Sequence, residues 1–451
     1  MGYFSKVLIA NRGEIARRII RTCNKLDIKT VAVYSEADAE APHVSEATEA
    51  VCIGPAHAKK SYLNIEKVIQ VAKETHADAI HPGYGFLSEN PDFARRCEEE
   101  NIVFIGPSAE TMRIMGSKLE ARAQMQKAGV RVVPGTDKSL ESVEEALEIA
   151  DELGYPLMLK ASAGGGGIGM QLVQDQSELM KVFDETRQKA NSFFNDGTVF
   201  LEKWISKPRH IEVQIVADAY GNVLHLFERE CSVQRRNQKV LEESPSPFLN
   251  DALRNELLEA AILGVKQIGY TNVGTMEFIF DENEKFYFLE MNTRLQVEHP
   301  VTEEITGLDL VELQLKIAAK EKLSITQEDI NKTGHAIECR LYAEDPDTFF
   351  PSPGVISRLI LPENDVRLDL AIIEGSAVTP FYDPMIGKVI VHGLTRDHAI
   401  TKMQRVLKEI DIQGIKTNIP LLKQIMKNSS FISGNYTTEF LAENKAQLLE
   451  R

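Results

Sequence analysis

The first hundred residues alternate between short apolar runs and longer segments in which apolar residues repeat at helical spacing. The apolar runs predict buried strands at residues 6–10, 30–35, 78–80 and 102–105. After the first strand, Asn11-Arg12-Gly13 leads into a predicted helix whose apolar face carries Ile15, Ile19, Cys23 and Leu26. This alternation predicts a parallel sheet with helices on both faces. The first strand is not followed by GxGxxG, so the pattern does not predict dinucleotide binding.

Two further apolar strands are expected at 157–160 and 170–173, after a helix over about 108–134. The strands are joined by Ala163-Gly164-Gly165-Gly166-Gly167-Ile168-Gly169. Glycines let the backbone approach a phosphate and leave N–H groups free to bind it, and their place between two strands favours a hairpin over a linker. Neither Lys-Ser nor Lys-Thr follows, so this is not a Walker A loop. Lys160 is placed to reach a phosphate oxygen, with an ordinary surface lysine as the alternative.

Residues 199–291 alternate between apolar and polar as antiparallel strands do. Two hairpins are expected there, formed by 211–217 with 223–229 and by 274–280 with 285–291. If the second hairpin is symmetric about residues 283–284, Glu277 lies directly opposite Glu290, with the side chains about 5 Å apart. Two facing carboxylates repel unless one is protonated or a cation lies between them. Mg²⁺ prefers oxygen ligands of this kind, so the pair predicts a metal site.

If the second strand of this hairpin continues, its period of two places five polar residues on one face: Glu290, Asn292, Arg294, Gln296 and Glu298. The intervening residues are mainly apolar and would face the core: Met291, Thr293, Leu295 and Val297. A solvated strand face is the alternative reading. Such faces favour Lys, Thr and Glu, whereas this mixture of acid, amide and guanidinium favours a binding surface.

Beyond Gly334 the chain consists of short strands, several turns and a final helical segment. The fold class is therefore mixed, α/β and α+β. A length of 451 residues exceeds one ordinary core and allows two to four packed units. Hydrophobic residues make up 43% and charged residues 26%, the balance of a globular protein.

The net charge of −16 disfavours a nucleic-acid partner. Residues 229–239 nevertheless carry four cations, which form either a solvated face or one wall of a cleft for anions. The five cysteines show no CxxC spacing and predict neither a disulfide framework nor a zinc site. No apolar run is long enough to span a bilayer, and the N-terminus does not resemble a signal peptide. A cytoplasmic location without a membrane partner is expected.

Four motifs resemble those of biotin carboxylases: Ala10-Asn11-Arg12-Gly13-Glu14-Ile15-Ala16, His81-Pro82-Gly83-Tyr84-Gly85, Glu290-Met291-Asn292-Thr293-Arg294-Leu295-Gln296-Val297-Glu298-His299 and Tyr382-Asp383-Pro384-Met385-Ile386-Gly387-Lys388. The resemblance runs from about residue 5 to 440 and implies the ATP-grasp fold. It implies an N-terminal Rossmann-like domain over 1–114, an ATP-grasp domain over 115–330 with a lid at about 132–203, and a C-terminal domain over 331–446. The implied activity is the carboxylation of biotin with ATP and bicarbonate, by way of carboxyphosphate.

The resemblance also implies roles for individual residues. ATP would be held by Lys118, Lys160, Gly164, Gly165, Gly166, Gly167, Gly169, Glu202, Lys203, Trp204, Ile205, His210 and Gln234. Bicarbonate would be held by Lys239, Arg294, Gln296 and the backbone of Val297. Two Mg²⁺ or Mn²⁺ ions would bind Glu277, Glu290 and Asn292. Glu298 would deprotonate bicarbonate, and Arg340 would stabilise the enolate form of biotin.

Three positions depart from the commonest pattern of the family: Ala163, Ile168 and Asn237. They affect one lid contact and one nucleotide contact, and they remove no group that the chemistry requires. Two other functions remain open, a related ligase that makes carbamoyl phosphate and a regulatory nucleotide-binding module. The Arg340 region and the 382–388 motif speak against the first, and the intact Glu298 and metal pair speak against the second.

The chain carries no biotinylation motif, because Met426-Lys427 is followed by Asn428. A separate biotin carboxyl carrier protein is therefore expected, with carboxyltransferase subunits as further partners. The resemblance is greatest to the biotin carboxylase subunit of bacterial acetyl-CoA carboxylase, which begins fatty-acid synthesis. It also implies a homodimer, with Arg18 and Arg21 on the first helix as interface candidates.

Overall fold

The computed structural model describes residues 4–163, 169–194 and 196–449. Its N-terminal part is a five-stranded parallel sheet in the order β3-β2-β1-β4-β5. The four predicted strands are present as β1 (Lys6–Ile9), β2 (Lys29–Ser35), β4 (Ala79–His81) and β5 (Val103–Phe104). The strand β3 (Glu49–Gly54) was not predicted, because it forms an edge of the sheet and half of its residues are exposed.

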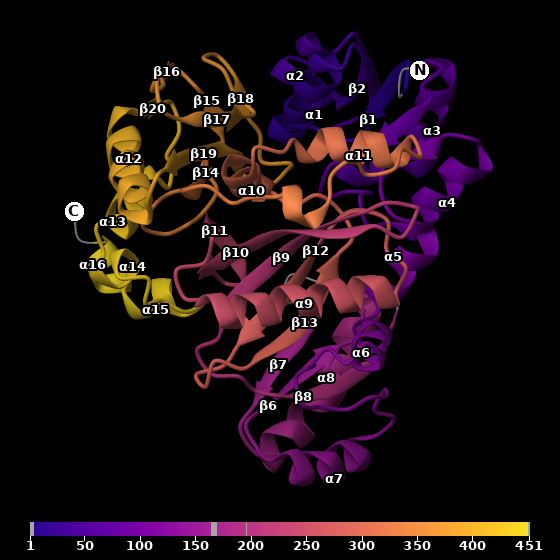
Figure 1. The fold of residues 1–451 in the computed structure, drawn as a ribbon, viewed down its shortest axis with the longest axis vertical. Helices are drawn as coiled ribbons and strands as arrows, with labels where there is room; N and C mark the ends of the chain where they lie inside the picture. Colours follow the sequence, from indigo (N-terminus) through magenta and orange to yellow (C-terminus); the bar gives the residue numbers. More distant parts are fainter. Residues whose placement is uncertain (1–3, 164–168, 195, 450–451) are drawn as a thin grey trace.

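Helices cover both faces of this sheet, as the alternation of strands and helices along the chain predicts. Val7 and Ile9 pack with α1 (Gly13–Lys25), whereas Leu8 packs with α3 (Ile65–Glu74) and α4 (Pro91–Glu99) on the other face. A short helix, α2 (Pro42–Glu46), precedes β3. Figure 1 shows the N-terminal part beside the orange helix α11 (Leu310–Ala318). Arg18 contributes to that contact, because its guanidinium is buried and donates to Glu303 and Asp309.

The prediction of a single helix over residues 108–134 is wrong. Two helices occupy this segment, α5 (Ala109–Gly116) and α6 (Lys118–Lys127). Ser117 separates them because its hydroxyl accepts a hydrogen bond from the Glu120 N–H and caps α6. After Gly129, which has a positive φ, the chain is extended and Val132 bridges to Phe288.

The predicted strands around the glycine run form a separate small sheet in the order β7-β6-β8. As predicted, β6 (Leu157–Ala161) and β7 (Met170–Val173) pair antiparallel, and β8 (Val199–Lys203) lies on the other side of β6. Apolar side chains of α7 (Val143–Leu153) and α8 (Gln176–Phe194) cover this sheet. Figure 1 shows the unit projecting from the body of the molecule at the lower end of the view.

The largest sheet has eight antiparallel strands in the order β13-β12-β9-β10-β11-β14-β19-β17. Both predicted hairpins are confirmed, as β9 with β10 and as β12 with β13. The strands are β9 (Arg209–Ala217), β10 (Val223–Arg235), β11 (Gln238–Ser244), β12 (Asn272–Phe280), β13 (Phe286–Asn292), β14 (His335–Tyr342), β17 (Arg367–Leu370) and β19 (Met385–Gly393). The strands beyond Gly334 join the same sheet, because Leu241 of β11 pairs with Cys339 of β14.

Helices surround the large sheet. Apolar residues of α9 (Asp251–Gln267) pack on β9 and β12, and apolar residues of α12 (Arg396–Glu409) pack on β14 and β19. The chain ends with α13 (Ile419–Ile425), α14 (Ser429–Ile432), α15 (Phe440–Glu443) and α16 (Lys445–Leu449). Short strands form two small sheets, β15 (Gly354–Val355) with β18 (Ala377–Val378) and β16 (Arg358–Ile360) with β20 (Asp411–Gln413).

The second strand of the β12–β13 hairpin does not continue to residue 298, so the assumption of one long strand is wrong. The strand ends at Asn292, and residues 293–298 form an irregular connection to α10 (His299–Thr306). The apolar residues Met291 and Leu295 are buried in the core, as the alternation predicts.

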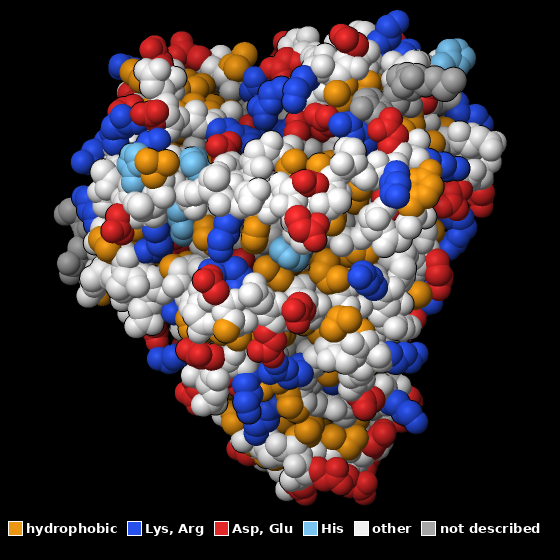
Figure 2. Space-filling model, viewed as in Figure 1, with side chains coloured by type: hydrophobic (Ala, Val, Ile, Leu, Met, Phe, Trp, Pro, Cys, Tyr) orange, Lys and Arg blue, Asp and Glu red, His pale blue; other side chains and the backbone are white. Residues whose placement is uncertain are grey.

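The exposed surface carries charges of both signs. Figure 2 shows acidic and basic side chains interspersed over the viewed face, with apolar side chains scattered between them. Among the helices of the described residues, none combines the length and apolar character that crossing a bilayer needs.

Candidate active site

A cleft of about 960 Å³ lies between the N-terminal part, the small sheet and the large sheet. Sixteen of the predicted site residues line it: Lys118, Lys160, Glu202, Lys203, Trp204, Ile205, His210, Gln234, Lys239, Glu277, Glu290, Asn292, Arg294, Gln296, Val297 and Arg340. Glu298 lies directly behind the lining, in contact with Lys239 and Arg340. Residues 164–167 lie outside the described residues. Gly169 is not part of the lining, and its carbonyl accepts a hydrogen bond from Ala161 in the hairpin.

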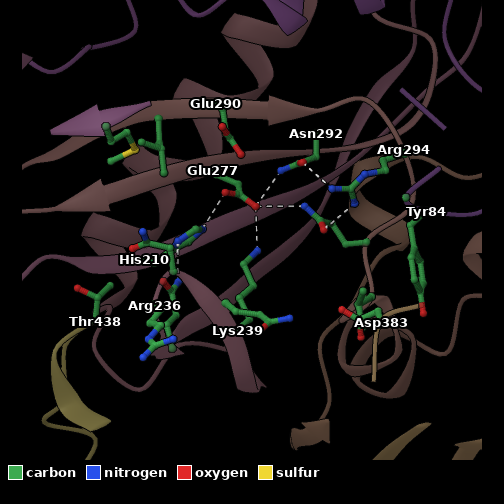
Figure 3. Close-up of a pocket in the computed structure, with 18 of the residues that line it drawn as sticks. Tyr84, His210, Arg236, Lys239, Glu277, Glu290, Asn292, Arg294, Asp383 and Thr438 are labelled. Carbon is green, nitrogen blue, oxygen red and sulfur yellow. Dashed lines mark hydrogen bonds and ion pairs between the residues drawn. The ribbon is translucent and has the colours of Figure 1, made fainter. Parts of the chain in front are cut away.

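Glu277 and Glu290 are register partners across β12 and β13, as the sequence predicts. A bulge follows Glu277, so the pairs nearer the turn are shifted by one residue. Figure 3 shows both carboxylates on the cleft side, where Asn292 donates to Glu277 across 2.8 Å. Burial and the neighbouring Glu277 raise the pKa of Glu290, and the opposing effects of Lys118 and His210 are smaller. A divalent cation between the two glutamates would supply further positive charge.

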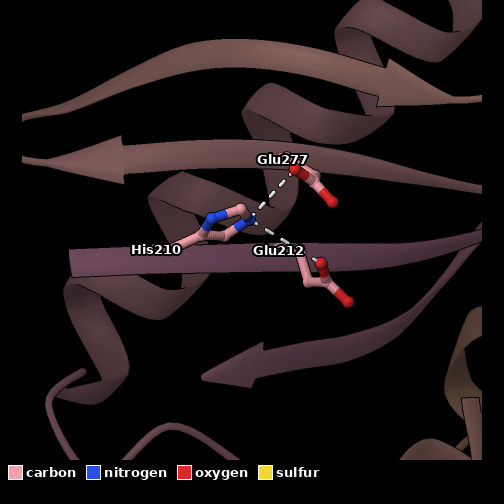
Figure 4. A group of neighbouring side chains, drawn as sticks. All are labelled: His210, Glu212 and Glu277. Atoms are coloured by element: carbon pink, nitrogen blue, oxygen red, sulfur yellow. Dashed lines mark ion pairs between the residues drawn. The ribbon is translucent and has the colours of Figure 1, made fainter. Parts of the chain in front are cut away.

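A second group of metal-ligating side chains lies deeper in the sheet. Figure 4 shows the His210 ring between Glu277 and Glu212. His210 Nε2 is 3.0 Å from Glu277 and 3.9 Å from Glu212. The Lys239 ammonium already lies among these carboxylates, 2.5 Å from Glu212 and 2.8 Å from Glu277. A positive charge therefore occupies this position, and the Glu277–Glu290 pair fits a metal ion better.

Lys239 of β11 donates to three carboxylates, those of Glu212, Glu277 and Glu298. An ammonium group has three donors, so all of them are engaged. Burial alone would lower the pKa of Lys239, but the three carboxylates outweigh it and raise this pKa well above its ordinary value. Lys239 is therefore a permanent cation at the floor of the cleft.

Glu298 is fully buried at the N-terminus of α10. Lys239 donates to one of its oxygens across 2.6 Å, and Arg340 of β14 donates to the other across 3.0 Å. Burial alone would favour the neutral acid, but these two cations lower the pKa of Glu298 below its ordinary range. Arg340 is itself held by Glu242 of β11, across 2.6 Å.

Arg294 is fixed on three sides near the mouth of the cleft. It donates to Glu89 across 2.8 Å, to Asn292 across 2.9 Å and to Gln296 across 3.0 Å. Gln296 in turn donates to Glu277 across 3.1 Å. These bonds join the irregular connection 293–298 to the hairpin and to the N-terminal part, although no strand continues there.

Of the predicted ATP-binding residues, Lys160, Glu202 and Lys203 line the cleft from the small sheet. Glu202 of β8 accepts hydrogen bonds from Lys160 and, across 2.7 Å, from Arg122 of α6. Lys203 donates to the carbonyl of Gly154 across 2.6 Å. His210 and Gln234 are hydrogen-bonded to each other across 3.0 Å. Burial lowers the pKa of Lys118.

Several residues of the site were not predicted. Glu212 and Glu242 hold the two cations that contact Glu298, and both glutamates are fully buried. A signal for Glu242 exists in the sequence, because it stands directly after the apolar Val240-Leu241 of a strand. Arg236, by contrast, belongs to the four cations of residues 229–239, and with Lys239 it lines the cleft (Figure 3), as one of the two readings of that segment predicted. Its neighbour Asn237 also has a positive φ, which asparagine tolerates better than most residues.

Three family models match consecutive parts of the chain. They are "Biotin carboxylase, N-terminal domain" over residues 3–112, "Carbamoyl-phosphate synthase L chain, ATP binding domain" over 117–326, and "Biotin carboxylase C-terminal domain" over 338–443.

Curated relatives cover the full length of the chain. Biotin carboxylase 2 of Bacillus subtilis is 59% identical over 98% of this chain and 100% of its own length. One of the pyruvate carboxylase subunits of Methanothermobacter thermautotrophicus is 50% identical over 98% of this chain and 90% of its own.

Solved structures of biotin carboxylases are similar to this chain over nearly its full length. The biotin carboxylase domain dimer of Hydrogenobacter thermophilus 2-oxoglutarate carboxylase, in complex with MgADP, ADP and bicarbonate, superposes with a TM-score of 0.96 at 48% identity. It covers 99% of both chains. The β,γ-ATP complex of Campylobacter jejuni biotin carboxylase gives a TM-score of 0.95 at 48% identity, over 98% of this chain and 99% of the other. With this fold, this cleft and this full-length similarity, the chain belongs to the biotin carboxylase family.

Proposed function

We propose that the chain is the biotin carboxylase component of a multisubunit carboxylase and carboxylates biotin on a separate carrier protein, at the expense of ATP. The observation that carries the proposal is the position of Glu298. It stands between Lys239 and Arg340, with the Glu277–Glu290 pair in the same cleft. A base, two cations and a pair of metal-binding acids are the groups that phosphorylation of bicarbonate requires.

Glu277 and Glu290, with the Asn292 amide, would hold Mg²⁺ or Mn²⁺, and we propose two such ions. The metal would neutralise charge on the phosphates of ATP. Lys118 and Lys160 line the same part of the cleft and would bind phosphate oxygens. Glu202, Lys203, Trp204, Ile205, His210 and Gln234 would hold the rest of the nucleotide, and glycines 164–167 and 169 would cover it.

Bicarbonate would bind to Lys239, Arg294, Gln296 and the backbone N–H of Val297. All the donors of Lys239 point to carboxylates, so an entering anion has to draw at least one of them away. Each cation that turns from Glu298 to bicarbonate raises the proton affinity of Glu298. Binding of the substrate would thus convert a weakly basic carboxylate into the base that accepts the bicarbonate proton.

Arg340 would stabilise the negative charge that develops on biotin in the second step, the carboxylation itself. Carboxyphosphate would decompose to CO₂ and phosphate beside biotin. The phosphate would take the proton of the ureido N–H, so that negative charge develops on the ureido oxygen while the nitrogen attacks CO₂. The guanidinium of Arg340 lines the cleft and is always charged, so it can bind this oxygen. Its bond to Glu242 would hold it in place when its bond to Glu298 is exchanged for a substrate contact.

The known complexes support the choice of substrates. The Hydrogenobacter thermophilus domain was solved with MgADP and bicarbonate, and the Campylobacter jejuni enzyme as a β,γ-ATP complex. The decisive experiment measures phosphate release from ATP with and without bicarbonate, and the incorporation of labelled bicarbonate into free biotin. ATP cleavage that ignores bicarbonate would contradict the proposal.

Formation of carbamoyl phosphate is the second candidate, because the central family model is that of a carbamoyl-phosphate synthase domain. Adding ammonia to the same assay tests it, since this activity would produce carbamoyl phosphate from labelled bicarbonate. We expect no such product, because the flanking domains match biotin carboxylase models.

We propose acetyl-CoA as the final acceptor, in a cytoplasmic acetyl-CoA carboxylase with a biotin carboxyl carrier protein and carboxyltransferase subunits. The similarity to free-standing bacterial biotin carboxylases supports this choice, while relatives that serve pyruvate and 2-oxoglutarate carboxylases are the alternatives. Affinity capture of the biotinylated partner, followed by transfer of label to acetyl-CoA, pyruvate or 2-oxoglutarate, distinguishes the three acceptors.

We also propose that the chain is a homodimer, as the biotin carboxylase domain of Hydrogenobacter thermophilus is. Arg18 is a poor interface candidate because it is 3% exposed and is bound to Glu303 and Asp309. Arg21 is about half exposed, although it also pairs with Asp369, and it stays a candidate. Light scattering of the parent and of an Arg21→Glu variant tests both statements.

A further inference from the structure

Lys388 lies on β19 and is fully buried, which is unusual for a lysine. Its register partner on the neighbouring strand β14 is Arg340. Side chains of directly paired residues share one face of the sheet and lie about 5 Å apart, so two cations there repel each other. Both cations can remain buried only if each has its own acceptors.

The acceptors of Lys388 come from two distant segments. Its ammonium lies 3.0 Å from Glu14, in the first turn of α1, and donates to the backbone carbonyl of Val297 across 2.8 Å. Tyr84 also donates to Glu14, and Tyr84 lines the cleft, as Figure 3 shows. Lys388 thus joins the N-terminal part, the connection 293–298 and the C-terminal strands at one point.

The carbonyl that Lys388 binds belongs to the peptide bond between Val297 and Glu298. A donor on this carbonyl fixes the plane of that peptide, and with it the direction in which Glu298 leaves the backbone. No strand or helix fixes these residues, because β13 has ended at Asn292 and α10 begins at His299. Lys239 and Arg340 hold the carboxylate end of Glu298, while Lys388 holds its backbone end.

We infer that Lys388 is a positioning residue for the bicarbonate step, which orients Glu298 through the Val297 carbonyl without touching a substrate. This inference rests on the proposed function. A purely structural role, in which Lys388 only neutralises Glu14, is the alternative. The two roles predict different effects of replacing Lys388 on the KM for bicarbonate and on nucleotide binding.

The first test replaces Lys388 with methionine, which keeps the length of the side chain but removes the donor. We expect the KM for bicarbonate to rise and kcat to fall, each by about 10- to 100-fold, as is typical when a reacting group is misplaced. Binding of ADP, measured by calorimetry, should stay within about twofold of the parent. Lys402→Met is the matched control, because Lys402 also donates to a backbone carbonyl, that of His392, but away from the cleft.

The second test is the double variant Glu14→Gln/Lys388→Met, which removes both charges and leaves Tyr84 an acceptor. If the role of Lys388 were only to neutralise Glu14, this variant would recover parental kinetics. We expect the defect for bicarbonate to persist, because the Val297 carbonyl still lacks its donor. Recovery, a parental KM for bicarbonate in Lys388→Met, or failure of the double variant to fold would overturn the inference. A parent enzyme without bicarbonate dependence would instead overturn the proposed function, and the inference with it.

Discussion

The guanidinium of Arg340 lies 3.0 Å from the carboxylate of Glu298, although one residue stands on β14 and the other at the start of α10. The sequence predicts separate roles for them, in separate domains. Their contact means that a change in one alters the charge balance of the other. Both roles can still be tested separately, because each acts in a different chemical step.

Replacement of Glu298 with glutamine should stop the first step. The variant lacks the base that accepts the bicarbonate proton, so bicarbonate-dependent ATP cleavage and biotin carboxylation should fall together, by about 10²- to 10⁴-fold. Phosphate release and label fixed into biotin are measured side by side. A Glu298→Gln enzyme that cleaves ATP at the parental rate would show that another residue is the base.

Replacement of Arg340 with serine should mainly impair the second step. Biotin carboxylation should be lost, whereas much of the ATP cleavage should remain and become uncoupled from product. The loss of one cation should also raise the pKa of Glu298, because Arg340 contributes to its lowering. The pH profile of ATP cleavage should therefore shift to higher pH. Equal loss of both activities would contradict the assignment.

The metal site is tested by Glu277→Gln and Glu290→Gln. Each variant should need a higher concentration of Mg²⁺ or Mn²⁺ and should turn over much more slowly, because one carboxylate of the facing pair is lost. Glu282→Gln is the control, since Glu282 is exposed at the turn of the same hairpin. Parental titration curves for Mn²⁺ in both cleft variants would refute the site.

The Lys160→Met variant tests the predicted ATP-binding part of the cleft. This change removes a cation that lines the cleft and contacts Glu202, so the KM for ATP should rise by about tenfold or more. The KM for bicarbonate should change little, because Lys160 contacts Glu202, which is not one of the predicted bicarbonate ligands. Lys189→Met serves as the control, since Lys189 is exposed on α8 and pairs with Glu185. An unchanged KM for ATP would place the phosphates elsewhere.

The buried carboxylate of Glu243 should make the stability of the folded state depend on pH. It is fully buried and accepts hydrogen bonds from His335, Arg396 and Tyr436. Burial alone would raise its pKa, but these donors lower the pKa of Glu243 to about 2. A lowered pKa stabilises the folded state above the ordinary pKa of about 4.5, and this stabilisation is lost as pH falls toward 2.

The expected contribution of Glu243 is roughly 3 kcal/mol, from a change of about 1.4 kcal/mol for each pH unit. Urea unfolding at pH 6 and at pH 3 should show that the parent loses more stability over this range than Glu243→Gln does. Glu256→Gln, on the exposed surface of α9, should follow the parent. A Glu243→Gln variant with the parental pH dependence would refute this account.

The sequence by itself determined the features that depend on local periodicity. The alternation of strands and helices predicted helices on both faces of the parallel sheet, and the symmetry of one hairpin placed Glu277 opposite Glu290. These predictions hold because pairing across a short turn and the direction of side chains follow from the spacing of residues along the backbone. The resemblance of its motifs predicted the biotin carboxylase family.

Only the tertiary structure decided how distant segments meet. The strand expected beyond residue 291 ends at Asn292, because hydrogen bonds from Arg294 and Gln296 and the ammonium of Lys388 hold the chain in an irregular path. Glu242 and Arg340 come together because β11 pairs with β14, across a sequence separation of 98 residues. Such contacts depend on strand order and on the burial of charge, and neither is encoded in the local pattern of apolar and polar residues.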